Sequence, residues 1–196
     1  MKKGFTLIEL LVVVLIIGIL AGVAVVEYKG AIKRARALKG IPLGRAIQTA
    51  MDEYAMAGGN WSDMFFGGLT FSLPDGATDE NGNPYVNGRL DTLGKNKWIC
   101  YDFRKADMRC YQLQSGNKKY GRLQYKTLYV DPANSTGGSD AEGILYFYSN
   151  YSGAEDGAYD GWIRCTYQNG ANKLYTEEFC KMLGGVKMQN NSYRIN

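Results

Sequence analysis

Hydrophobic and polar positions divide this chain of 196 residues into parts with different periodicities. The first part is an apolar run from Phe5 to Val26, and Glu9 is the one charged residue in it. About 22 residues at a rise of ~1.5 Å each span ~33 Å, close to the thickness of a bilayer's hydrocarbon core. The pattern therefore predicts a helix long enough to cross a membrane, with a carboxylate near its start.

An amphipathic helical pattern follows the apolar run. Apolar residues recur at spacings of three and four, as on one face of a helix: Tyr28, Ile32, Ala35, Leu38, Ile47, Ala50, Met51, Tyr54 and Ala55. Pro42, with Gly40 and Gly44 beside it, indicates a kink or break. Gly58-Gly59-Asn60 ends the pattern. We expect the second half of this helix to pack its apolar stripe on a sheet.

The second half of the chain alternates short apolar stretches with turn-forming residues. Five stretches rich in aromatic and β-branched residues are strand candidates: Lys97–Phe103, Met108–Leu113, Leu123–Val130, Ile144–Tyr151 and Trp162–Tyr167. A meander of antiparallel strands over the helix follows from this order. The predicted fold class is α+β, a long N-terminal helix on a C-terminal antiparallel sheet.

Composition narrows the function classes. The chain contains no His, which removes the commonest general base and metal ligand. Its net charge of +4 comes from interspersed acids and bases, unlike the concentrated basic face of a nucleic-acid-binding protein. Asp79, Asn81 and Asn83 alternate as in a calcium loop, but Pro84 stands where that loop needs glycine. We expect no enzymatic activity, cofactor, metal site or nucleic-acid partner.

Three interpretations compete for the N-terminal segment. A secretory signal peptide and an ordinary membrane anchor both leave Glu9 unexplained, because an ionisable residue inside a membrane segment indicates a function. The third starts from Lys2-Lys3-Gly4 followed by Phe5-Thr6-Leu7-Ile8-Glu9. This stretch resembles the class III signal of type IV pilins and type II secretion pseudopilins. The resemblance is close over residues 1–36.

The resemblance implies a processing step and a role for Glu9. A prepilin peptidase would cut between Gly4 and Phe5 and N-methylate Phe5, leaving the apolar helix in the mature protein. Glu9 would then pair with the new Phe5 amine, of its own chain or a neighbour, during assembly. Thr6 would add a hydroxyl hydrogen bond nearby. A snorkelling or protonated Glu9 near an interface is the alternative.

Small residues on the apolar helix suit close packing against other helices. Gly18 and Gly22 have the GxxxG spacing, although glycine is also simply common in membrane helices. Many members of the family carry a proline near the position of Val26, and this chain has none. The local helix melting associated with that proline is therefore not implied.

The resemblance gives the chain five segments. We expect a leader over 1–4, a hydrophobic transmembrane and filament-core helix over 5–27, and its amphipathic continuation over 28–57. A connecting region over 58–96 and a disulfide-containing β-sheet head over 97–196 complete the pilin fold.

Four cysteines fit two disulfides in an oxidising compartment. Three pairings are possible. Cys100 and Cys110 fall in the first two strand candidates, as in a disulfide that joins a hairpin. Cys165 and Cys180 enclose a segment that resembles the disulfide-bonded C-terminal region of pilins. We favour Cys100–Cys110 with Cys165–Cys180.

The expected function is that of a pilin, the structural subunit of a type IV pilus-like filament. Its partners would be copies of itself, the prepilin peptidase, an inner-membrane assembly platform with its ATPase, and membrane lipid before extraction. A type II secretion pseudopilin and a minor pilin or adhesin with a binding head are the alternatives.

The expected location is the bacterial inner membrane, with the head in the periplasm, and then the extracellular filament. Basic residues over 29–45 outnumber Lys2-Lys3, so the positive-inside rule alone would place the head in the cytoplasm. We give the leader more weight, because the cysteines and the Gly-, Asn- and Tyr-rich head suit the outside.

Overall fold

A computed structural model describes most of the chain: residues 6–73, 75–79, 81–85, 98–101, 108–114, 121–128, 141–153, 158–167, 177–188 and 191–195. The chain consists of two compact units, residues 1–36 and residues 37–196, which we call the stalk and the head. Each unit is described by itself.

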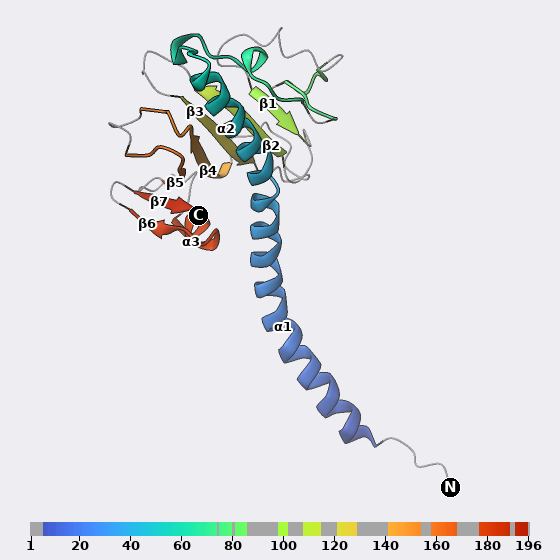
Figure 1. Cartoon of the computed structure of the whole chain (residues 1–196). Coiled ribbons are helices and arrows are strands. Elements are labelled where there is room, and N and C mark those ends of the chain that lie inside the picture. The colour runs from blue at the N-terminus through green and yellow to red at the C-terminus, as the bar shows by residue number, and fades with distance from the viewer. Residues whose placement is uncertain are drawn as a thin grey trace. The chain divides into compact units, whose positions relative to one another are not determined.

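Two helices occupy the first part of the chain (Figure 1). Helix α1 covers Leu7–Leu38, and α2 covers Ile41–Met56. A single helix to residue 57 was expected, with a kink or break near Pro42. The structure shows a break at Lys39–Gly40, because Pro42 in the first turn of α2 has no N–H to continue the hydrogen-bond ladder of α1. Two short 3₁₀ turns follow, η1 (Trp61–Asp63) and η2 (Phe66–Gly68).

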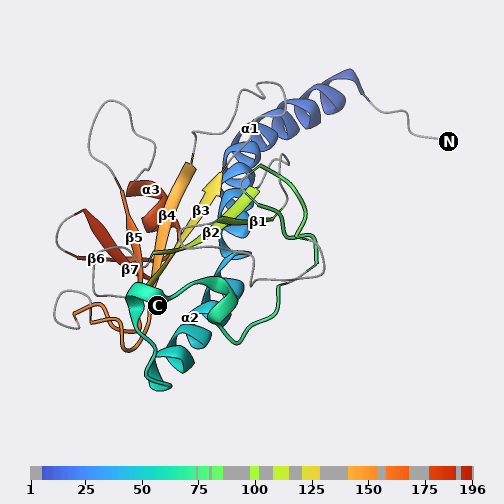
Figure 2. The same cartoon turned by 90° about the horizontal axis from the view of Figure 1, so that it is seen from above.

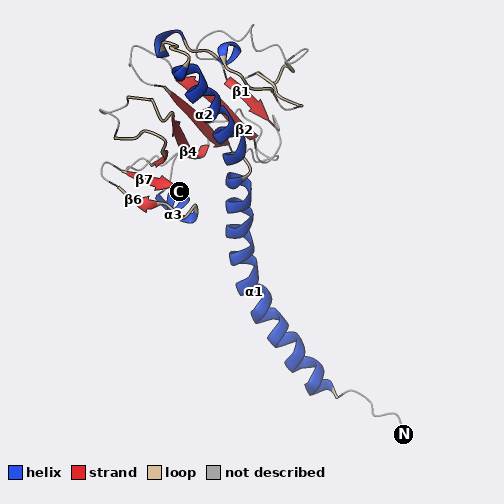
Figure 3. Cartoon of the chain, in the orientation of Figure 1, coloured by secondary structure: helices blue, strands red, loops and turns tan. Residues whose placement is uncertain are grey.

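The head contains one antiparallel sheet (Figures 2 and 3). Its strands are β1 (Trp98–Tyr101), β2 (Met108–Gln114), β3 (Arg122–Leu128), β4 (Ala141–Tyr148), β5 (Ile163–Thr166), β6 (Val186–Lys187) and β7 (Ser192–Ile195). Their order is β1-β2-β3-β4-β5-β7-β6. A third helix, α3 (Glu177–Met182), precedes the last two strands. The predicted α+β class is confirmed.

The strand register places one set of side chains in the core. Partners across adjacent antiparallel strands share a face of the sheet, and two such rows are buried: Ile99, Tyr111, Tyr125, Leu145, Cys165 and Tyr193 in one, Leu113, Leu123, Phe147, Ile163 and Ile195 in the other. Helix α2 packs on this face over β3 and β4 through Ile47, Ala50 and Met51. The expectation that the second half of the helix packs on a sheet is confirmed.

Aromatic rings hold the start of α2 where the helix is interrupted. The Tyr111 hydroxyl donates to the Gly40 carbonyl at 2.9 Å, and the Tyr125 hydroxyl donates to the Ala37 carbonyl at 3.3 Å. The two rings stack with centroids 4.9 Å apart. A Cβ on Gly40 would collide with the Tyr125 ring, and one on Gly44 would collide with the ring of Phe147. The break is therefore built into the core of the head.

Polar side chains fasten α2 to the turn that follows β4. The buried Gln48 amide donates to the Tyr148 carbonyl at 2.5 Å. The Asp52 carboxylate accepts from the Ser149 hydroxyl at 2.5 Å and from the backbone and side-chain nitrogens of Asn150 at 2.8 and 2.6 Å. Buried polar groups of this interface thus find partners inside the head, as a stable core requires.

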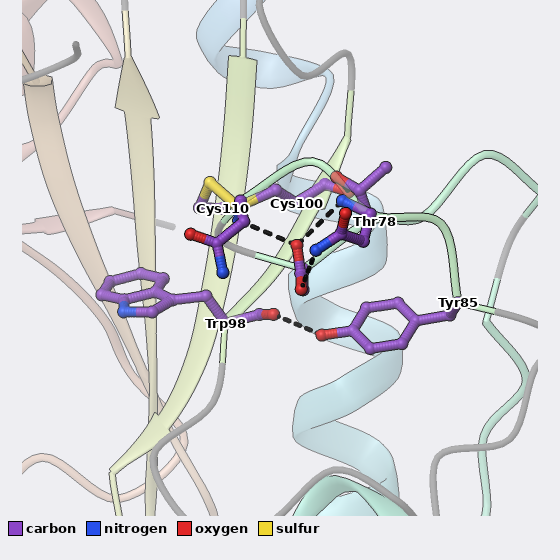
Figure 4. Close-up of a disulfide and its surroundings, with 8 residues drawn as sticks. Thr78, Tyr85, Trp98, Cys100 and Cys110 are labelled. Carbon is purple, nitrogen blue, oxygen red and sulfur yellow. Dashed lines mark hydrogen bonds between the residues drawn. A yellow bond between two sulfur atoms is a disulfide. The ribbon is translucent and has the colours of Figure 1, made fainter.

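The structure joins Cys100 to Cys110 and Cys165 to Cys180. Cys100 and Cys110 are direct partners in β1 and β2, with Cα atoms 4.1 Å apart. Thr78 pairs with the outer edge of β1 here, exchanging two backbone hydrogen bonds of 2.8 Å with Cys100 (Figure 4). The Tyr85 hydroxyl donates to the Trp98 carbonyl at 2.7 Å. Residues 77–79 and 81–85 are therefore attached to the edge of the sheet.

The last two strands were not expected from the sequence. Strand β6 has two residues and β7 has four, and neither stretch carries the long aromatic or β-branched run that identified the others. Strand β7 pairs with β5 on one side and with β6 on the other, so tertiary pairing rather than local propensity defines it.

Candidate assembly segment

Among the residues that the structure describes, none buries the apolar stretch of α1. Leu7–Val25, 19 residues, is long and apolar enough to cross a bilayer. Its large apolar side chains are all exposed in the single chain, from 46% for Val12 to 85% for Leu7. Exposed apolar surface of this extent indicates a binding surface for lipid or for other apolar helices.

Glu9 and Thr6 form a reciprocal cap at the start of α1. Both the backbone N–H and the hydroxyl of Thr6 donate to Oε2 of Glu9, at 2.8 and 2.6 Å. The Glu9 N–H donates to the Thr6 hydroxyl oxygen at 3.4 Å. This is a capping box, with Thr6 before the first helical residue and Glu9 at the third helical position. The negative charge also lies at the positive end of the helix dipole.

The sequence prediction missed this cap, although its signal is present. Thr6-Leu7-Ile8-Glu9 has the T-x-x-E spacing directly before an apolar run, which is the signature of a capping box. The stretch Thr176-Glu177-Glu178-Phe179 is also predicted, from its sequence, to form a capped helical turn. Helix α3 does begin at Glu177, whereas Thr176 lies outside the described residues.

The other predicted assembly residues are placed by the helix or lie outside the described residues. Gly18 and Gly22 are one helical turn apart on α1, and a Cβ at either position would meet no atom within 4 Å. Both glycines are therefore open to contact from outside the chain. Gly4 and Phe5, the predicted processing site, lie outside the described residues.

The C-terminal part of the head is held by a charged cluster around Glu177. Its Oε1 accepts from the Tyr193 hydroxyl at 2.5 Å and from Lys187 Nζ at 3.2 Å, and Lys181 Nζ lies 3.5 Å away. These contacts, the Tyr193 bond first, lower the pKa of Glu177 to about 2 and raise the pKa of Tyr193 to about 12. The pKa of Lys187 is raised, chiefly by its hydrogen bond to Glu177.

In the loop that resembles a calcium loop, the Asp79 carboxylate is hydrogen-bonded within the loop itself. Asp79 Oδ1 accepts from the backbone N–H groups of Asn81 and Asn83, at 2.8 and 2.9 Å, and Oδ2 accepts from the Asn83 side chain at 2.9 Å. These bonds, the Asn83 side chain first, lower the pKa of Asp79. The described residues contain no group of three or more His, Cys, Asp or Glu that could hold a metal ion.

Arginines stack on aromatic rings across the face of the sheet opposite to α2. Arg122 lies over Tyr146, Arg164 over Tyr159 and Arg194 over Trp162, with distances of 4.6, 4.5 and 4.3 Å to the ring centroids. Each of these cation–π contacts occupies one face of its aromatic ring. These aromatic residues thus contribute to packing of the sheet.

Residues 1–25 match the family model described as the prokaryotic N-terminal methylation motif. No solved structure matches the chain.

Several curated relatives are pilins or fimbrial proteins. The type IV major fimbrial protein FimA of Dichelobacter nodosus is 38% identical over 73 residues, 37% of this chain and 47% of that protein. A type IV major pilin protein PilE1 of Neisseria gonorrhoeae is 41% identical over 106 residues, 50% and 49% of the two chains. A fimbrial protein of Neisseria meningitidis serogroup B is 43% identical over 61 residues, 31% and 36%.

These matches cover at most about half of the relatives they reach, 49% in the longest of the three. The N-terminal match includes the predicted processing site and Glu9, and its apolar residues form the exposed stretch of α1. The chain carries the N-terminal methylation motif of prepilins and is similar, over part of its length, to type IV major pilins.

Proposed function

We propose that this protein is a structural subunit of a type IV pilus-like filament. One observation carries the proposal: the N-terminal methylation motif leads directly into a helix whose apolar side chains are all exposed in the single chain. Similarity to proteins named as type IV major pilins and fimbrial proteins supports it. In this proposal the chain is a building block and catalyses no reaction.

The proposed sequence of events begins at the membrane. The chain is inserted in the bacterial inner membrane through Leu7–Val25, with its head in the periplasm. A prepilin peptidase cuts between Gly4 and Phe5 and N-methylates Phe5. An assembly platform driven by an ATPase then moves the subunit from lipid into an extracellular filament, where the apolar helix is buried against its copies.

Burial of the apolar helix is the proposed driving contact of assembly. Each buried Leu, Ile or Val side chain contributes on the order of 2 kcal/mol relative to water, but lipid is already apolar. The gain on leaving the membrane must therefore come from helix packing and polar contacts. Gly18 and Gly22 would let a neighbouring helix approach closely, and Glu9 would receive the cationic amine of Phe5.

The proposal is tested by Glu9→Ala, with Glu27→Ala as the matched control. Glu27 is an exposed carboxylate on the same helix, beyond the apolar stretch. We expect both variants to be cut after Gly4, as seen by mass spectrometry. Filament yield should fall about tenfold or more for Glu9→Ala, since the amine then lacks a counter-charge at the edge of hydrocarbon. Glu27→Ala should assemble as the wild type does.

Other outcomes distinguish the alternatives. Normal filament yield from Glu9→Ala would contradict the proposed role of the carboxylate. Deletion of the chain that stops secretion of enzymes but leaves surface fibres intact would identify a pseudopilin. If the head binds glycans and cells that lack the chain still form fibres, the chain is a minor pilin or adhesin.

A further inference from the structure

One face of the sheet in the head carries arginines held against aromatic rings. Tyr146, Arg164 and Arg194 are cross-strand partners on β4, β5 and β7. They alternate along their strands with the buried core rows, so they lie on the face turned away from α2. Arg122, Arg164 and Arg194 each lie over a ring, 4.6, 4.5 and 4.3 Å from its centroid. We call the surface defined by these three residues the arginine face.

Stacking on a ring orders a guanidinium and covers only one of its flat sides. The N–H donors of arginine lie in the plane of the group, so its edge can still bind a carboxylate. Because the side chain is already ordered, binding costs less conformational entropy. Arg194 is exposed, and it forms no ion pair with any residue that the structure describes. The arginine face is therefore suited to bind acidic groups.

The other side of the head carries acidic residues without basic ones. Residues 46–88 include six Asp or Glu and no Lys or Arg. Glu53 on α2, Asp63 in η1 and Asp75 after η2 are exposed. Phe66 of the same segment is buried in the core together with α2, so the segment lies on the α2 side of the sheet. We call the surface defined by Glu53, Asp63 and Asp75 the acidic surface.

We propose that the arginine face of one head binds the acidic surface of the head of a second copy. The inference rests on the proposed function and adds which surfaces of the heads meet. The charges of the two surfaces are complementary, and the sheet separates them within one head. A contact between two different surfaces leaves one of each kind open at the ends, so it continues from copy to copy, as an open filament requires.

The composition of the arginine face also favours a protein interface. Arg, Tyr and Trp are the residue types that contribute most to binding energy at such interfaces. The arginine face combines all three, since its arginines lie over two tyrosines and one tryptophan. A second copy is the partner that brings the acidic surface in equal number, because every copy carries both.

Two double substitutions reverse the charge of one surface each. Arg122→Glu with Arg194→Glu makes the arginine face acidic, and Glu53→Lys with Asp75→Lys makes the acidic surface basic. None of the four side chains belongs to the buried core. Lys181→Glu is the matched control, because Lys181 is an exposed base on α3, outside both surfaces. Melting temperatures in one detergent compare the folding of all variants.

The measurement is filament yield of the full chain, expressed in place of the wild type. Each double variant should lose about tenfold in yield, because like charges then meet at the contact. Lys181→Glu should assemble as the wild type does. Combining all four substitutions in one chain exchanges the signs of both surfaces and should restore the yield to within about twofold.

Coexpression of the two double variants tests whether the contact lies between copies. One variant then carries two acidic surfaces and the other two basic ones, so neither assembles alone. Together they should form mixed filaments, in which each acidic surface meets a basic one. Rescue by coexpression cannot come from an effect within a single chain.

Wild-type yield from either double variant would overturn the inference, and so would failure of both combinations to restore filaments. If the double arginine variant melts below the wild type, Arg194→Glu alone decides, since that side chain is exposed. Normal filaments of the arginine variant that no longer bind dextran sulfate would assign the arginine face to an acidic ligand outside the filament, and would also overturn the contact. A wild-type chain that forms no filaments would contradict the proposed function and this inference with it.

Discussion

The stretch Leu7–Val25 and the head differ in how much of their apolar surface is buried within the chain. The head buries its apolar residues in two cross-strand rows under α2, and its interface polar groups, such as Gln48, are bonded within the head. The apolar stretch leaves its large side chains exposed. Its side-chain hydrogen bonds are those of Thr6 and Glu9, which cap backbone N–H groups at the start of the helix. The head thus buries its own apolar residues, whereas the apolar stretch leaves its apolar surface for contacts from outside the chain.

The contrast extends to single glycines. The Phe147 ring occupies the space that a Cβ at Gly44 in α2 would need. Packing inside the head therefore requires glycine at this position. Gly22 in α1 has open space around it, so no contact with another described residue requires glycine there. The same residue type thus serves the chain's own packing in one helix and is available to a neighbour in the other.

The largest expected effect comes from removing the apolar stretch. A fragment that lacks residues 1–28 should be soluble and monomeric without detergent, because its remaining large apolar residues are mostly buried. It should unfold in one cooperative transition. Light scattering after size exclusion, with thermal unfolding by circular dichroism, would measure both properties. Aggregation of the fragment in buffer would show that the head also depends on an outside partner.

Removing a disulfide tests how far the head depends on internal links. For the double substitution Cys165→Ala and Cys180→Ala, a closed loop of about 15 residues predicts a loss of about 3 kcal/mol in the free energy of unfolding. Denaturant titration of the soluble fragment measures it. Cys100→Ala with Cys110→Ala, a matched pair elsewhere in the sheet, should lose a similar amount. A loss under about 1 kcal/mol for either pair would contradict the view that the disulfide stabilises the head by restricting the unfolded chain.

The glycine contrast is tested by Gly44→Ala against Gly22→Ala. The new methyl group at position 44 has to displace the buried Phe147 ring, so the head should lose about 2 kcal/mol of stability, as in other overpacked cores. Gly22→Ala should leave the unfolding midpoint of the head unchanged. Chemical unfolding of both variants in the same detergent would compare them. Equal midpoints would remove the distinction between the two glycines.

The smallest expected effect concerns pH. The pKa of Glu177 is lowered to about 2, so the cluster stabilises the head above the carboxyl's usual pKa and loses that contribution as the pH falls from about 4.5 to 2. The pKa of Tyr193 is raised to about 12, so its contribution is lost between pH 10 and 12. Melting temperatures of wild type and Glu177→Gln against pH should converge at both ends. A constant difference across the acid range would contradict the assignment.

Much of the fold was predictable because its signals are local. An uninterrupted apolar run, a three- and four-residue repeat and five short strand candidates each depend on neighbouring residues. The break at Lys39–Gly40 was indicated by Pro42, but its stabilisation by Tyr111 and Tyr125 involves residues about 70 or more positions away. Strands β6 and β7 were missed for the same reason, since β7 exists through its pairing with β5.

Prediction of the candidate site from the sequence was limited for a different reason. The apolar helix and the position of Glu9 could be recognised from a short motif, yet the partner of Glu9 in the single chain could not be recognised from charge alone. A hydrogen bond from the Thr6 hydroxyl near Glu9 was expected, but the reciprocal capping box was not, although T-x-x-E stands in the sequence. Pairing with the Phe5 amine involves a cut chain and stays a prediction.

The short pairing of Thr78 with β1 has a consequence for crowded heads. In the proposed filament, bundled helices would hold the heads at a very high local concentration, where an open sheet edge would pair with the edge of a neighbouring head and aggregate. Thr78 occupies the backbone groups of Cys100 at one edge, and at the other edge β6 is only two residues long and carries Lys187. Both edges of the sheet are therefore poor templates for strand pairing, and contacts between heads in the proposed filament would be left to side chains.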